Sequence, residues 1–331
     1  MKKLISTGVI KNIALVGISK NAGKTSLLNS LLKEFPLPDR AVMSTGIDGE
    51  SEDRVFKTPK PQVHLFKGDI FCCDANTVTQ HGSSVSLLHS SQYAGRKLYL
   101  ARAEESLATQ ITGPSALSHQ RVMIDTMHQL GAHKVFIDGS LDRKSIALDD
   151  SIDALILAIG ASFGSTEQIV TEIRRLCILR DIPTAELSVS CYNRLKESDA
   201  LMILRKAQWQ STGIKSLIGN EKKVLELLEQ EPRALYVPTS FTDSLYEKLG
   251  RTLSKPGFEM ILRHPECLKL NIANLRGLMK HTQTKCLISF KLAAFALNST
   301  AIGSDPISAD LFREDIRTAF PREQFYDIME I

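Results

Sequence analysis

The sequence has 331 residues, of which 43% are hydrophobic and 24% charged, so it can bury the core of one large α/β unit or of two smaller ones. The formal net charge of +4 is small for this length, and no basic block marks a nucleic-acid or anionic-membrane surface. No run reaches the roughly 18 apolar residues that span a bilayer, and residues 1–12 lack the long apolar stretch of a signal peptide. We therefore expect a cytoplasmic protein with neither nucleic acid nor a membrane as partner.

Short apolar runs alternate with helical patterns in the first quarter of the chain. Residues 13–16 predict a strand that leads into glycine and lysine, and residues 25–34 carry leucines at helical spacing. Residues 40–44 predict a second strand. Residues 63–66 and 70–73, joined by three residues, predict a β-hairpin.

The alternation continues through the rest of the chain. Continuous apolar runs indicate strands that are covered on both faces. The predicted strands are residues 97–101, 134–137, 154–159 and 234–237, with a further apolar segment at 292–297, and the predicted helices are 115–130, 166–180 and 242–253. This order predicts an α/β fold of the P-loop NTPase type, with a doubly wound, mainly parallel sheet and helices on both faces.

The division into domains is less clearly marked. We expect a P-loop nucleotide-binding core over residues 1–165 and a C-terminal α/β extension over 166–331, which could complete the same sheet. Residues 188–219 are polar and irregular, and they are the best candidate for a boundary or an insertion.

The motif with the clearest chemistry is Gly17-Ile-Ser-Lys-Asn-Ala-Gly-Lys-Thr-Ser26. Small residues let backbone N–H groups wrap a polyphosphate, and the following helix adds partial positive charge at its N-terminus. In such a loop Lys24 reaches the β- and γ-phosphates, and the Thr25 hydroxyl binds Mg²⁺. The first glycine stands one position earlier than in the standard pattern, where this chain has Ile18. The predicted nucleotide contacts are Ser19, Lys20, Asn21, Ala22, Gly23, Lys24, Thr25 and Ser26.

A P-loop also needs a carboxylate that holds the Mg²⁺ water shell from a neighbouring strand. Asp138 ends the apolar run 134–137 and is the candidate for this Walker B role, although an aspartate in a turn beside glycine is common. The acidic loop 44–53 follows the second strand. Within it Asp48 or Glu50 could order the attacking water or act as general base, and Asp48 could also face the metal. A flexible surface loop is the other interpretation of this segment.

Several other polar residues have both a functional and a structural interpretation. Arg143 and Lys144 could contact an anion or could belong to a solvated loop. Ser115 is interpreted as the N-cap of the helix that follows. No Asn-Lys-x-Asp motif reads guanine, which favours ATP. The six cysteines form no C-x-x-C pair and are interpreted as small buried side chains, and the dispersed histidines predict no metal other than Mg²⁺.

Four segments resemble a known family, the P-loop proteins identified as reactivase subunits of adenosylcobalamin-dependent lysine 5,6-aminomutase. They are residues 16–25, 44–53, 136–145 and 155–161, so the resemblance covers about the first 165 residues, with a weaker echo at 295–312. The family shares the displaced first glycine. The resemblance implies an ATP-dependent helper that exchanges damaged cobalamin for intact cofactor on the mutase, together with a second reactivase subunit. It carries over Gly23, Lys24 and Thr25 as nucleotide contacts and Asp48 and Asp138 as metal-side residues.

Three functions remain open on the sequence. The first is an ATPase that acts on a partner mutase. The second is a small-molecule kinase or ATP-dependent ligase of the dethiobiotin-synthetase type, with Arg102, Arg143 or Lys144 as anion contacts. The third is a nucleotide sensor that does not hydrolyse its ligand.

Overall fold

The computed structural model describes residues 9–19, 22–35, 39–45, 62–93, 95–140, 148–299 and 308–328. The chain divides into two compact units. Unit 1 comprises residues 1–169 and 291–331, and unit 2 comprises residues 170–290. The expected C-terminal extension is therefore divided, because its last segment belongs with the N-terminal part of the chain.

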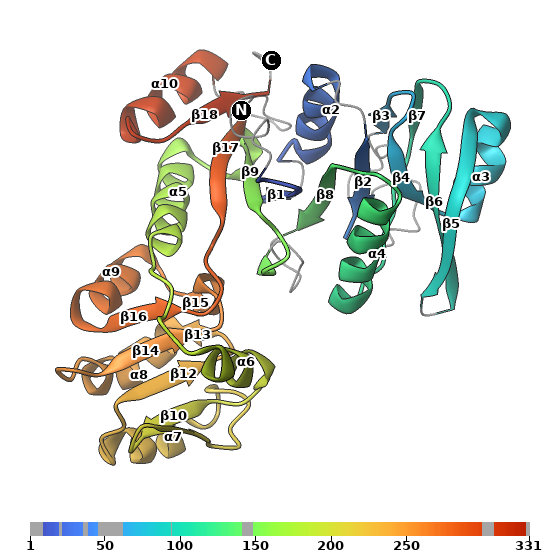
Figure 1. Cartoon of the computed structure of the whole chain (residues 1–331). Coiled ribbons are helices and arrows are strands. Elements are labelled where there is room, and N and C mark those ends of the chain that lie inside the picture. The colour runs from blue at the N-terminus through green and yellow to red at the C-terminus, as the bar shows by residue number, and fades with distance from the viewer. Residues whose placement is uncertain are drawn as a thin grey trace. The chain divides into compact units, whose positions relative to one another are not determined.

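Unit 1 is built on a sheet in the order β18-β17-β9-β1-β8-β2-β4-β6-β5 (Figure 1). The strands from β18 to β4 are parallel, whereas β6 is antiparallel to both of its neighbours. The strands are β1 (Asn12–Gly17), β2 (Arg40–Ser44), β4 (Ile70–Cys73), β5 (Val85–Tyr93), β6 (Arg96–Ala103), β8 (Lys134–Ser140), β9 (Ala154–Gly160), β17 (Leu292–Asn298) and β18 (Phe325–Asp327).

Helices cover this sheet on both sides, and Figure 1 shows α2 and α4 on opposite sides of β8 and β2. Consecutive residues of β1 are buried, which is the pattern of a strand covered on both faces. The helices of unit 1 are α2 (Lys24–Glu34), α3 (Ala75–His81), α4 (Leu117–Gln129), the first part of α5 (Thr166–Arg180) and α10 (Ala309–Ala319), with 3₁₀ turns η1 (Gly82–Ser84) and η3 (Ala161–Phe163). The expected α/β architecture with a large, mostly parallel sheet is confirmed.

The hydrophobic core on the α2 side shows how sequence spacing produces this packing. Leu27, Leu28 and Leu31 occupy one side of α2, and they pack with Leu15 of β1 and Phe136 of β8. Each of these side chains is at most 1% exposed. Burial of one such side chain contributes roughly 1.5–3 kcal/mol before entropy is subtracted, so this cluster fixes α2 against the strands that flank its N-terminus.

The prediction of a β-hairpin at residues 63–73 is wrong. β3 (Val63–Leu65) pairs antiparallel with β7 (Leu107–Thr109), while β4 lies between β2 and β6 of the main sheet. The four residues that join β3 and β4 instead place Asp69 beside Arg40. Arg40 donates from Nε and Nη2 to the Asp69 carboxylate at 2.8 and 2.9 Å, and both residues are 2% exposed.

Unit 2 has its own five-stranded sheet in the order β11-β10-β12-β14-β16, in which β12, β14 and β16 are parallel. Its strands are β10 (Met202–Arg205), β11 (Gln208–Ser211), β12 (Ala234–Val237), β14 (Glu259–Leu262) and β16 (Gln283–Cys286), with the short pair β13 (Phe241–Thr242) and β15 (Leu268–Lys269). Its helices are α6 (Val189–Glu197), α7 (Glu221–Glu229), α8 (Asp243–Leu253), α9 (Ile272–His281) and the 3₁₀ turn η4 (Pro265–Cys267). Residues 188–219 hold α6, β10 and β11, so reading them as irregular was wrong.

Candidate functional site

The turn between β1 and α2 folds back over the end of its own strand. A Cβ atom added to Gly17 would lie 3.0 Å from Ala22 Cβ, 3.0 Å from the Ser19 carbonyl oxygen and 3.3 Å from Lys24 Cγ. The Ile18 N–H donates to the Ala158 carbonyl of β9 at 3.1 Å, which fixes the start of the turn to the sheet. A side chain at position 17 would therefore fill the space over which the turn curls.

Gly23 provides the sharp bend that starts α2. Its φ of 90° and ψ of 19° lie in the left-handed region, which glycine adopts without a steric penalty. The first N–H groups of an α-helix have no acceptor within the helix, and the first turn of α2 holds no acidic residue. The N-terminal end of α2 is thus open to an anion on grounds of both hydrogen bonding and charge.

Asp138 stands on the strand next to this turn. β8 pairs directly with β1, and Asp138 is in register with Leu15 on one side and Ser44 of β2 on the other. Because residues in register point to the same face, Asp138 shares the α2 face with Leu15 and, two residues further along, with Gly17. Asp138 is half-buried, and its carbonyl accepts from the Thr45 N–H at 2.9 Å.

These residues meet at the carboxyl edge of the parallel strands. After β1 the chain continues to β2, which lies on the β8 side of β1. After β8 it continues to β9, which lies on the opposite side of β1. The carboxyl edge at such a reversal of strand order is where open α/β sheets bind ligands. The β1–α2 turn and Asp138 lie at that point of the sheet.

The loop before α4 packs against the end of β2. The Ser44 N–H donates to the Thr112 carbonyl at 3.0 Å, and a Cβ at Gly113 would lie 1.8 Å from the Ser44 carbonyl oxygen. Gln120 Nε2 donates to the carbonyls of Pro114 at 2.7 Å and Thr45 at 3.3 Å. The predicted Ser115 cap is wrong, since Ala116 is the N-cap of α4 and makes no side-chain cap bond. This loop instead holds the end of β2 in place.

The structure brings together only some of the predicted site residues. Ser19, Ala22, Gly23, Lys24, Thr25, Ser26 and Asp138 belong to the described part of the chain. The predictions for Lys20, Asn21, Asp48, Glu50, Arg143 and Lys144 fall outside the described residues. Arg102 lies on β6, four strands from β1, or about 19 Å at ordinary strand spacing, so it is not near the turn.

Asn298 is a site residue that sequence reasoning missed. It ends β17, and its Nδ2 would be 2.7 Å from a Cβ on Gly23. In the sequence it is the first polar residue after the apolar run 292–297, the same signal that marked Asp138 after 134–137. Nothing in the sequence indicates that β17 pairs with β9, so the sequence alone does not connect Asn298 with the β1–α2 turn.

Two adjacent cysteines of β4 are excluded as reactive groups. Cys72 and Cys73 are fully buried and carry no disulfide. Burial raises the pKa of both thiols, that of Cys73 to about 12. They therefore stay protonated and act as core side chains, and in the part of the chain that the structure describes no three His, Cys, Asp or Glu residues gather as a metal site.

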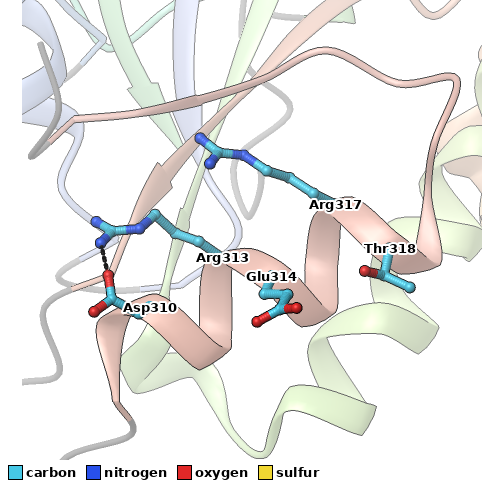
Figure 2. Close-up of a pocket in the computed structure, with 5 residues that line it drawn as sticks. All are labelled: Asp310, Arg313, Glu314, Arg317 and Thr318. Carbon is cyan, nitrogen blue, oxygen red and sulfur yellow. Dashed lines mark hydrogen bonds and ion pairs between the residues drawn. The ribbon is translucent and has the colours of Figure 1, made fainter.

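An open hollow of about 500 Å³ lies elsewhere, along α10. Figure 2 shows that Arg313 and Arg317 extend from one side of this helix, and Arg313 is bonded to Asp310. Arg313 Nη1 also donates to the buried Asp327 at 3.2 Å. The residues that line this hollow all belong to α10 and include none of the β1–α2 turn, so the hollow is not part of the candidate site.

Fold and site together define an α/β protein with a large, mostly parallel sheet and a glycine-shaped turn at its carboxyl edge. Comparison with protein-family models, with curated proteins and with solved structures finds no match for this chain. No helix in the described ranges is long and apolar enough to cross a bilayer.

Proposed function

We propose that this protein binds ATP with Mg²⁺ at the β1–α2 turn and hydrolyses it. The observation that carries the proposal is the position of Lys24 and Ala22 over Gly17, with Asp138 one strand away on the same face of the sheet. A basic side chain, a helix N-terminus and a carboxylate thus converge on one edge of the sheet. This is the arrangement that a metal-bound polyphosphate requires.

The residues present fit both ligands. Gly17 and Gly23 keep the turn free of Cβ atoms at the two positions where neighbouring atoms lie within 3.0 Å. Mg²⁺ prefers oxygen ligands, and the Thr25 hydroxyl and the Asp138 carboxylate are oxygen donors. The first turn of α2 adds no negative charge that would repel a phosphate.

Each side chain has a separate role in the proposal. Lys24 contacts the terminal phosphates and balances the charge that develops on them, while Thr25 and Asp138 hold the metal directly or through water. When bound, Mg²⁺ supplies Lewis-acid stabilisation of the phosphate oxygens. Asp48 or Glu50, which follow β2 in the sequence, would orient the attacking water.

The test of binding is calorimetric titration of Mg²⁺–ATP into Lys24→Ala and into Lys33→Ala, a control on the exposed last turn of the same helix. Loss of a charged contact of about 2 kcal/mol should weaken binding by about 30-fold in Lys24→Ala only. Equal affinity in the two variants would rule out the β1–α2 turn as the nucleotide site.

The test of hydrolysis compares Asp138→Asn with Asp125→Asn on the exposed side of α4. Asp138→Asn should retain most of the ATP affinity and lose about 100-fold or more in turnover, because asparagine is a poorer partner for the metal shell. Normal turnover in Asp138→Asn would move the Walker B role to another residue.

We further propose that an adenosylcobalamin-dependent aminomutase is the partner, with a second reactivase subunit. This part rests only on the sequence resemblance of residues 16–25, 44–53, 136–145 and 155–161. Addition of a mutase inactivated by damaged cobalamin should stimulate ATP turnover by the wild type and not by Lys24→Ala. Unstimulated turnover in a protein that binds ATP would favour a small-molecule kinase or ligase instead.

A further inference from the structure

Gln120 is a buried polar side chain in the first turn of α4, and it has no part in the nucleotide contacts proposed above. It is 2% exposed. Its Nε2 donates hydrogen bonds to the carbonyl oxygens of Pro114 at 2.7 Å and Thr45 at 3.3 Å. Both partners can only accept hydrogen bonds, so the amide nitrogen and oxygen cannot exchange places. The side chain is therefore held in one orientation, in which it joins the loop before α4 to the residue after β2.

The oxygen of the same amide is not satisfied. Gln120 Oε1 is buried, and no donor in the described part of the chain reaches it. A buried acceptor without a donor costs roughly 1–3 kcal/mol. Groups of this kind are few in native proteins, and they are expected mainly where a residue has a functional role. The position of Nε2 is thus the property of Gln120 that requires an explanation.

The hydrogen bond to Thr45 continues to Asp138. The Thr45 N–H donates to the Asp138 carbonyl oxygen at 2.9 Å, which extends the pairing of β2 with β8 by one residue. A Cβ on Gly139 would lie 3.5 Å from Thr45 Cγ2, so Thr45 also packs over the residue that follows Asp138. Thr45 is 7% exposed. A chain of hydrogen bonds therefore runs from Gln120 through the main chain of Thr45 to the main chain of Asp138.

The loop before α4 gives this chain of hydrogen bonds a fixed starting point. The Thr112 N–H donates to the Cys72 carbonyl of β4 at 2.9 Å, and the Thr112 carbonyl accepts from the Ser44 N–H of β2 at 3.0 Å. A Cβ at Gly113 would lie 1.8 Å from the Ser44 carbonyl oxygen, so only glycine lets the two segments pass this closely. The start of α4, and with it Gln120, is thus fixed against the end of β2.

We propose that Gln120 is a positioning residue for ATP hydrolysis, and that it acts through Thr45 on Asp138. This inference rests on the function proposed above. A group that holds the metal shell has to be placed to within about 0.5 Å. Removal of the amide would leave the carbonyls of Thr45 and Pro114 buried without their donor, so the end of β2 would move until water reached them. Asp138 would lose a fixed neighbour, although Gln120 itself touches neither the nucleotide nor the metal.

The test compares Gln120→Met, which keeps the length of the side chain and removes its N–H groups, with Gln129→Met on the exposed end of α4. Turnover is measured against Mg²⁺ concentration at saturating ATP, and ATP affinity is measured by calorimetry. In Gln120→Met only, turnover should fall about tenfold and the Mg²⁺ concentration for half-maximal turnover should rise several-fold, while ATP affinity at saturating Mg²⁺ stays within about twofold. A smaller folded fraction would lower turnover and leave the Mg²⁺ midpoint unchanged, so the midpoint separates positioning from stability.

Gln120→Glu provides a second measurement, which decides the matter if Gln120→Met does not fold. A protonated carboxyl donates one hydrogen bond and a charged carboxylate donates none, and burial favours the protonated form. Turnover of Gln120→Glu relative to wild type should therefore rise as the pH is lowered from about 8 to about 6.

The outcomes separate this role from the proposed function. An active wild type with the same Mg²⁺ midpoint in Gln120→Met and Gln129→Met, or with a constant activity ratio for Gln120→Glu across this pH range, overturns the role of Gln120 and leaves the ATPase proposal standing. A wild type that binds no ATP overturns both.

Discussion

Gly23 has a left-handed backbone conformation, and the Asn298 side chain packs against it. A side chain at position 23 would therefore cost stability in two ways, through backbone strain and through steric contact. The conformation alone costs an L-residue roughly 1–2 kcal/mol. Contact with Asn298 Nδ2 at 2.7 Å adds a steric term. Gly131 has a similar φ of 100°, but a Cβ at that position would meet nothing within 4 Å. The pair of glycines separates backbone strain from crowding.

We predict that Gly23→Ala destabilises the protein by more than Gly131→Ala, which should cost only the 1–2 kcal/mol of strain. Asn298→Ala should recover part of the Gly23→Ala loss in a double-mutant cycle, because it removes the crowding amide. Urea unfolding followed by circular dichroism measures all four variants. If both glycine variants lose the same free energy of unfolding, the Asn298 side chain can move away from a Cβ at position 23 without destabilising the protein.

At the same scale, sequence reasoning located residues whose partners are local and missed those whose partners are distant. Gly17, Lys24 and Asp138 follow or precede apolar runs that can be read directly from the chain. Asn298 and Gly113 acquire their meaning only when β17 is placed beside β9 and when residue 113 passes Ser44. A single sequence does not encode those pairings as a pattern, since hydrophobic spacing reports burial and not the neighbour.

At the scale of elements, the sequence predicted about half of the described strands and four of the nine described α-helices. These are the elements in which continuous apolar runs or leucine spacing give a strong local signal. The failure at residues 63–73 has a physical cause. A three-residue turn between two apolar runs looks the same whether the runs pair with each other or not. Here the buried Arg40 forms an ion pair with Asp69 of that turn. Arg40 also donates hydrogen bonds to the carbonyl oxygens of Leu32 and Phe35 at the end of α2. A long-range ion pair thus overrides a local hairpin signal.

The turn after β14 contains a buried histidine of unit 2, His264. His264 is 4% exposed, and its Nδ1 accepts a hydrogen bond from the Glu266 N–H at 3.1 Å. Its ring packs edge-on against the ring of Phe290, with the two ring centroids 5.4 Å apart. Burial lowers the pKa of His264 from 6.5 to about 4. Protonation would place a hydrogen on the nitrogen that now accepts, so the folded state disfavours the charged ring.

We predict that unit 2 loses stability as the pH falls from 6.5 toward 4. Between these values the unfolded chain binds the His264 proton and the folded chain does not, which costs about 2 kcal/mol at pH 5. Trp209, the single tryptophan, is buried in unit 2 and reports its urea unfolding. His264→Asn keeps an acceptor and should flatten the pH dependence, whereas the exposed His133→Asn should not. An unchanged slope in His264→Asn would assign the effect to another group.

At the scale of the whole molecule, the chain leaves unit 1 after residue 169 and returns at 291 to complete its sheet. The returning strand β17 pairs along β9, from Leu155 to Gly160. All seven residues of β9 are buried, and six of them are hydrophobic. Composition does not reveal this arrangement, because unit 2 has the same strand-and-helix alternation as the unit that contains it. A boundary at 165 was the natural expectation from the sequence.

The returning segment should therefore be needed for the proposed nucleotide site as well as for the sheet. In a fragment of residues 1–165, β9 would become an exposed apolar edge, which favours aggregation. We predict that this fragment neither melts cooperatively nor binds ATP. A chain in which residues 181–290 are replaced by a flexible linker of about 20 residues, with a typical span of about 25 Å, should do both, because β17 and β18 are retained. Thermal unfolding by circular dichroism and ATP titration compare the two with the full chain. Cooperative melting and full ATP affinity in the 1–165 fragment would mean that β1, β8 and the turn between β1 and α2 fold without β17, and that Asn298 does not shape the site.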